Sequence, residues 1–156
     1  MNINTYNLIL DEETRHTSLQ LKESFSYQRE TFGSPQYIHS MMVEIFQLDK
    51  LADEFVYLIA FNTKMRMLGI FEVSHGTANA SLVDARGVFL RAVYTGASYI
   101  MLVHNHPSGD ITPSREDMLI SKRMKEAGEL MGILLADHII IGSNGYFSFH
   151  EQELLK

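Results

Sequence analysis

Apolar residues recur along the chain in two patterns, and the two patterns predict different elements. Apolar runs at 55–61, 99–103 and 133–141 are typical of strands buried in a sheet. Apolar residues spaced three and four apart predict helices that begin near Ser34 and Ser114 and a third helix over 86–97. Strands and helices that alternate in this way indicate an α/β domain.

Turn residues indicate how some of the strands are joined. Asn62-Thr63-Lys64 returns the run at 55–61 into a strand over 67–73, and Asn144-Gly145 predicts a hairpin turn into 146–149. A further short strand is predicted at 81–83. Residues 1–33 are predicted to be an N-terminal extension with a hairpin of strands 6–10 and 17–27, followed by one domain over 34–156.

The segment 104–117 carries the densest candidate chemistry. His104 and His106 are two residues apart at the end of a predicted strand, so their side chains project to the same side. Asp117 falls on the first turn of the following helix, and two imidazoles with one carboxylate suit a metal such as zinc with room left for water. Helix capping alone also explains Ser114 and Asp117, but it does not explain the two histidines.

The spacing His-x-His, seven residues, Ser, two residues, Asp resembles the JAMM (MPN-plus) zinc metalloproteases, and the stretch His104 to Ser114 resembles the RadC branch of that family. Segments 74–77, 86–89 and 137–142 also resemble RadC proteins, so the resemblance covers about residues 34 to 149. It implies a JAMM/MPN (cytidine-deaminase-like) fold, with a mixed, mostly antiparallel sheet flanked by about three helices. It also implies one Zn²⁺ per chain, held by His104, His106 and Asp117.

The resemblance further implies a general base. Glu54, just before the strand at 55–61, matches the glutamate that takes a proton from water and delivers it to the leaving amine. Glu72 is the alternative base. The alternative interpretation of Glu54 is a solvated acid at a helix–strand junction, without a catalytic role. Ser114 is a candidate donor of a hydrogen bond to the oxyanion.

Three more polar residues are candidates for supporting the site. His75, in a bend between strands, either lines the cleft or is a hydrogen-bonded structural histidine. Asp137 and His138 interrupt an apolar strand, and adjacent strand residues point to opposite faces, so both cannot easily reach one ion. We expect them to lie beside the metal ligands rather than to bind the metal.

Composition narrows the possible functions. The chain of 156 residues has no cysteine, which excludes disulfides, thiolate zinc sites and the His/Cys zinc site of nucleobase deaminases. The formal net charge is -6 without a basic run, which disfavours direct nucleic-acid binding. No apolar stretch approaches the ~18 residues of a membrane span, so a cytoplasmic protein without membrane contact is expected.

The predicted function is therefore zinc-dependent hydrolysis of a peptide or isopeptide amide bond in an unknown protein or peptide substrate. Two alternatives come from the resemblance. One is a RadC-type protein associated with DNA repair, acting on or near DNA, and the other is a non-catalytic MPN scaffold. Homo-oligomers are compatible with the sequence.

Overall fold

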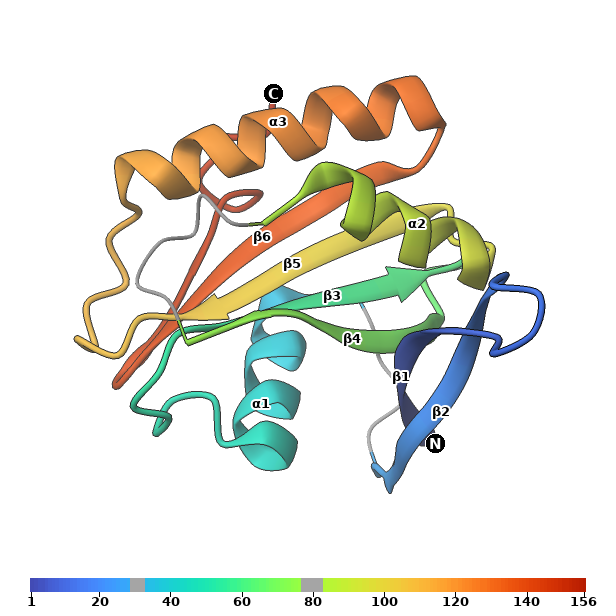
Figure 1. Ribbon diagram of the computed structural model, residues 1–156. Helices are drawn as coiled ribbons and strands as arrows, with labels where there is room; N and C mark the ends of the chain where they lie inside the picture. The colour runs from blue at the N-terminus through green and yellow to red at the C-terminus, as the bar shows by residue number, and fades with distance from the viewer. Residues whose placement is uncertain (29–32, 77–82) are drawn as a thin grey trace.

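The computed structural model describes residues 1–28, 33–76 and 83–156. These residues form an α/β fold, in which a 7-stranded mixed sheet has the strand order β2-β1-β4-β3-β5-β6-β7. Helices α2 and α3 cover one face of the sheet, and α1 lies on the other (Figure 1). The elements are β1 (Asn2–Leu10), β2 (Thr17–Ser26), α1 (Pro35–Phe46), β3 (Phe55–Phe61), β4 (Met67–His75), α2 (Ala85–Thr95), β5 (Tyr99–Asn105), α3 (Arg115–Met131), β6 (Leu134–Gly142) and β7 (Gly145–Ser148).

The strand directions confirm the expected fold class. Within the described residues, β1 with β2, β3 with β4, β3 with β5, and β6 with β7 pair antiparallel. The pairs β5–β6 and β1–β4 are parallel. Helix α3 connects β5 to β6 across the sheet, as a parallel pair requires. The sheet is therefore mixed and mostly antiparallel, with three helices in the described part of the chain.

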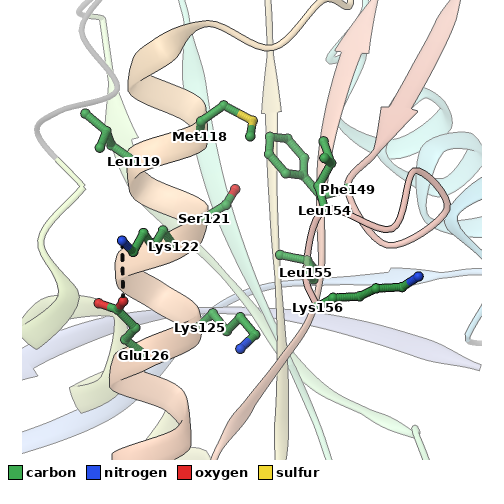
Figure 2. Close-up of a pocket in the computed structure, with 10 residues that line it drawn as sticks. All are labelled: Met118, Leu119, Ser121, Lys122, Lys125, Glu126, Phe149, Leu154, Leu155 and Lys156. Atoms are coloured by element: carbon green, nitrogen blue, oxygen red, sulfur yellow. Dashed lines mark ion pairs between the residues drawn. The ribbon is translucent and has the colours of Figure 1, made fainter.

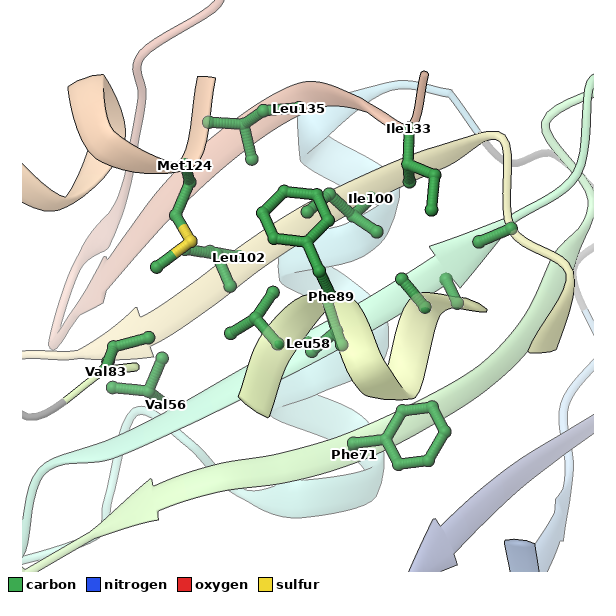
Figure 3. Close-up of a cluster of buried hydrophobic side chains, with 14 of the residues drawn as sticks. Val56, Leu58, Phe71, Val83, Phe89, Ile100, Leu102, Met124, Ile133 and Leu135 are labelled. Atoms are coloured by element: carbon green, nitrogen blue, oxygen red, sulfur yellow. The ribbon is translucent and has the colours of Figure 1, made fainter. Parts of the chain in front are cut away.

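The central strands β3 and β5 are buried on both faces, which explains their continuous apolar sequence. Side chains at even positions, such as Leu58 and Leu102, face α2 and α3, where they pack with Phe89 and Met124 (Figure 3). Side chains at odd positions, such as Ile59, belong to a second cluster under α1. This alternation decides which polar side chains at the strand ends share a face.

The helix ends follow local sequence signals. The Asp84 side chain accepts hydrogen bonds from the backbone N–H groups of Arg86 and Gly87, and α2 ends at Gly96 in the left-handed conformation. Ser34 occupies the N-cap position of α1, but its side chain makes no capping hydrogen bond. Of the strand predicted at 81–83, residues 81 and 82 lie outside the described residues, and Val83 is buried outside regular structure.

The N-terminal residues form a hairpin that extends the sheet. Strand β1 begins four residues before the predicted strand at 6–10, whereas β2 ends one residue before the predicted strand at 17–27. Strand β1 also bridges to β4 through Thr5 and Ile70. The division of the chain at residue 33 remains a prediction. In the described part of the chain, no helix combines the length and the apolar character needed to cross a membrane.

Candidate metal centre

The structure brings His104, His106 and Asp117 together at one end of the sheet. The Nε2 atoms of His104 and His106 are 3.1 Å apart, and they lie 3.1 and 3.3 Å from the Asp117 carboxylate oxygens Oδ1 and Oδ2. One possible ligand atom from each residue lies within 4.8 Å of the others, so the group could hold a metal ion. The side chains of His104 and Asp117 are only 1% exposed, whereas that of His106 is 16% exposed and opens the group to solvent.

Hydrogen bonds at the far nitrogens orient both imidazoles. His106 Nδ1 lies 2.7 Å from the Asp110 carbonyl oxygen, which only accepts, so we assign the proton to Nδ1 and the lone pair to Nε2. His104 Nδ1 lies 2.9 Å from His138 Nε2, and His138 Nδ1 contacts the Ser121 hydroxyl. We assign the donors so that His104 Nδ1 donates to His138 Nε2 and His138 Nδ1 donates to Ser121 Oγ. His104 Nε2 then also presents a lone pair. Two such lone pairs beside a carboxylate suit a metal ion.

His138 and Asp137 point to opposite faces of β6, as the sequence predicts. The His138 ring is fully buried and stacks on Phe149, with centroids 4.8 Å apart and planes at 16°. Burial lowers the pKa of His138 well below its ordinary value, which keeps the ring neutral and able to accept from His104. Asp137 instead accepts hydrogen bonds from the His138 and His150 backbone and from Ser148, so it organises the chain after β7 rather than the metal centre.

Asp117 is both a candidate ligand and a member of a helix cap. The backbone N–H and the hydroxyl of Ser114 each donate to Asp117 Oδ2 at 2.7 Å, and the Asp117 N–H donates back to Ser114 Oγ at 3.1 Å. Burial opposes ionisation of this carboxyl, but His104 and His106, which donate to it whenever their Nε2 atoms carry a proton instead of a metal, outweigh burial and hold its pKa well below the usual range. Capping therefore coexists with the proposed ligand role.

Glu54 lies on the same face of the sheet as the two histidines. Strand β3 pairs antiparallel with β5, with Val56 opposite His104, so the next even position towards the start of β3 lies beside His106. Burial raises the pKa of Glu54, while the nearby His104 and His106 oppose this increase. A half-buried carboxyl of raised pKa beside the group, but not part of it, is suited to proton transfer.

Glu72, the alternative base, lies on the opposite face. It pairs with Tyr57, whose side chain belongs to the cluster under α1. Burial first, and Glu72 second, raise the pKa of Tyr57 to about 12, which is consistent with this proximity. The structure thus places Glu54, and not Glu72, with the candidate ligands.

His75 lies at the rim of this opposite face. Its ring stacks on Phe55 with centroids 3.9 Å apart, and its Nε2 lies 3.3 Å from Asp53 Oδ2. These contacts agree with the interpretation of His75 as a hydrogen-bonded structural histidine.

Three residues that contribute to the arrangement are missing from the sequence-based set. Ser121 lies one helical turn after Asp117 on the same face of α3, a spacing that could have identified it. Phe149 and Asn105 carry no comparable signal, because their partners lie far away in the sequence.

Figure 2 shows a groove whose lining residues do not include the candidate ligands. It has a volume of about 400 Å³ and runs between α3 and the chain after β7. Its wall includes Ser121 and Phe149, which both contact His138. The remaining wall is apolar side chains interspersed with charged ones: Met118, Leu119, Lys122, Lys125, Glu126, Leu154, Leu155 and Lys156.

Comparison with known proteins identifies the family. The model of the RadC-like JAB domain matches residues 32–154. A UPF0758 protein of Thermotoga maritima is 42% identical over 123 residues, which cover 79% of this chain and 54% of the relative. A UPF0758 protein of Alkaliphilus metalliredigens is 43% identical over 122 residues, which cover 78% of this chain and 52% of the relative. The chain thus spans about half the length of the curated relatives it matches.

The names of these relatives state no activity, so the likeness establishes a family and not a reaction. The family match confirms the resemblance seen in the segment His104 to Ser114. It extends over most of the described sheet and all three helices, and it includes the His-His-Asp group. This chain belongs to the family of RadC-like JAB domain proteins.

Proposed function

We propose that this chain is a zinc-dependent hydrolase that cleaves an amide bond, peptide or isopeptide, in a protein or peptide substrate. The observation that carries the proposal is the convergence of His104, His106 and Asp117 beside the half-buried Glu54. Two imidazole nitrogens and one carboxylate oxygen fit zinc, and three protein ligands leave a fourth position open, as catalytic zinc sites do.

Zinc bound by these side chains would polarise a water molecule and the substrate carbonyl, so that hydrolysis proceeds near neutral pH. The Glu54 carboxylate accepts the proton from the attacking water and then donates it to the leaving amine nitrogen. The raised pKa of Glu54 supports both transfers, because a group that titrates nearer to neutrality exchanges protons in both directions. Ser114 donates to the developing oxyanion once its hydroxyl turns from Asp117 to the substrate.

Two substitutions separate metal binding from proton transfer. Glu54→Gln keeps the shape of the side chain but removes the base, so it is expected to retain about one zinc per chain while turnover falls ~10²-fold or more. His106→Ala removes a candidate ligand and is expected to lose the metal. Elemental analysis of protein purified without chelator measures the metal, and a panel of peptide and lysine-linked isopeptide substrates measures turnover.

Glu72→Gln is the matched control, since it makes the same change on the other face of the sheet and is expected to alter neither quantity. Full turnover in Glu54→Gln would show that the base assignment is wrong. A wild-type protein that carries no stoichiometric metal and takes up none from added zinc would instead favour the non-catalytic scaffold.

A further inference from the structure

Asn105 stands between the two candidate histidine ligands in the sequence, but its side chain points to the opposite face of the sheet. The side chain is buried, with the residue only 2% exposed. Its Oδ1 accepts a hydrogen bond from the Phe55 backbone N–H at 2.8 Å, and its Nδ2 donates to the Asp53 carbonyl oxygen at 3.0 Å. Both partners lie some 50 residues away in the sequence.

These two partners are the peptide groups on either side of Glu54. The Asp53 carbonyl belongs to the peptide bond before Glu54, and the Phe55 N–H belongs to the peptide bond after it. The backbone pairing of β3 with β5 ends at Val56 opposite His104, so the Asn105 amide continues the connection where the ladder stops. On the other side, the Gly76 N–H donates to the Glu54 carbonyl at 2.9 Å.

Only an amide side chain of this length satisfies both partners. The Phe55 N–H can only donate and the Asp53 carbonyl can only accept, which fixes the orientation of the Asn105 amide. An aspartate would place a carboxylate oxygen against the Asp53 carbonyl, and a leucine would leave both peptide groups unsatisfied in a buried place, at a cost.

We propose that Asn105 is a positioning residue that sets the distance between the carboxyl of Glu54 and the metal ligands. It ties the segment that carries Glu54 to the end of β5, which carries His104 and is followed directly by His106. This inference rests on the proposed function, because it presumes that Glu54 is the base. A displacement of about 1 Å in such a group lowers the rate ~10²-fold even when the metal stays bound.

The test needs no substrate, because Co²⁺ in place of zinc reports on the metal centre through its visible absorption. The spectrum is recorded against pH for wild type, Glu54→Gln, Asn105→Leu and the double variant. We expect Asn105→Leu to bind Co²⁺ with an affinity within about threefold of wild type, far from the ~10- to 100-fold loss seen when a partner of a metal ligand is removed. We expect the pH at the midpoint of the spectral change in Asn105→Leu to shift in the same direction as in Glu54→Gln. The shift should be at least half as large as the shift in Glu54→Gln. The double variant should then match Glu54→Gln.

Thr5→Val is the matched control for loss of a buried polar group elsewhere in the sheet. Thr5 is 6% exposed, and its hydroxyl donates to the Glu23 carbonyl, far from the candidate ligands in the sheet order. It should lower stability without shifting the spectrum. If Asn105→Leu does not fold, the isosteric Asn105→Asp retains the bond from the Phe55 N–H and is expected to show a smaller shift in the same direction.

Three outcomes would overturn the inference. If Asn105→Leu titrates as wild type while Glu54→Gln shifts, Asn105 does not position Glu54, and the base assignment stands. If Asn105→Leu loses Co²⁺ as His106→Ala does, Asn105 supports the ligands themselves. If Glu54→Gln retains Co²⁺ and titrates as wild type, the base assignment fails and the inference fails with it.

Discussion

The Ser114 hydroxyl group has a structural role and a proposed catalytic role. In the structure, the hydroxyl caps α3 by accepting from the Asp117 N–H and donates to the Asp117 carboxylate. In the proposed reaction, the same proton turns to the oxyanion of the substrate. The two roles differ in magnitude, because an N-cap contributes about 1 kcal/mol to stability, whereas an oxyanion donor contributes about 3 kcal/mol to the transition state.

Ser114→Ala should therefore lower the free energy of unfolding by about 1 kcal/mol and lower turnover ~10²-fold, a larger loss than the cap explains. Ser114→Thr keeps a hydroxyl at the same place and is the control, with stability and turnover close to wild type. Denaturant unfolding and substrate turnover measure the two effects. If Ser114→Ala loses stability but keeps its turnover, capping is the whole role of this residue.

Among the elements, the register of β3 against β4 sets the face of the sheet on which Glu72 lies. If Phe55 opposite His75 and Val56 opposite Ser74 continued in an unbroken ladder, Glu72 would lie opposite Leu58, whose side chain faces α2 and α3. The ladder instead shifts between Val56 and Tyr57, and Glu72 lies opposite Tyr57 on the face of α1. A register shift of one residue moves a side chain to the other face of the sheet, and no local sequence pattern predicts this shift.

The segment from His104 to Asp117 was predictable because its geometry is local. A strand end, a turn and a helix start place the three candidate ligands within 14 residues of each other. His138 and Asn105 depend on which strands neighbour β5, and such neighbours are set by long-range packing. The position of Glu54 came from the family resemblance and not from periodicity. The alternation along β6 did correctly separate Asp137 from His138.

A glycine at the end of β6 permits the close approach of the loop after His106. A β-carbon added at Gly142 would overlap the Gly109 carbonyl oxygen and the Ile111 side chain. The His106 N–H donates to the Ile141 carbonyl in the same region at 2.9 Å, which holds the start of the loop against the strand end. Gly142→Ala should lower stability by about 1–3 kcal/mol through overpacking, and should weaken zinc binding by displacing His106.

Gly87→Ala is the control for that substitution, since a β-carbon there meets no atom closer than 3.4 Å. Alanine also suits the first turn of α2, so stability should stay equal or rise. Zinc competition against a chromophoric chelator gives the affinities, and thermal unfolding gives the stabilities. Wild-type zinc affinity in Gly142→Ala would show that the loop adjusts without moving the ligand.

At the scale of the molecule, the metal centre joins elements from distant parts of the chain. The candidate ligands come from β5, the loop after it and α3, while His138 lies on β6 and Glu54 directly precedes β3. The formal net charge of -6 continues to disfavour direct nucleic-acid binding by this chain.

Because the candidate ligands converge only in the folded chain, we expect zinc binding to be linked to folding. A ligand that binds the folded state alone adds about 2.7 kcal/mol at a free concentration 100 times Kd, which for a chain of this size raises Tm by ~5–10 °C. Zinc should produce this increase in wild type and in Glu54→Gln, and EDTA should reverse it. His106→Ala should give one Tm in both conditions, because an imidazole and a carboxylate alone hold zinc weakly. A wild-type Tm that zinc and EDTA leave unchanged would mean that the three side chains, although close together, do not bind the metal.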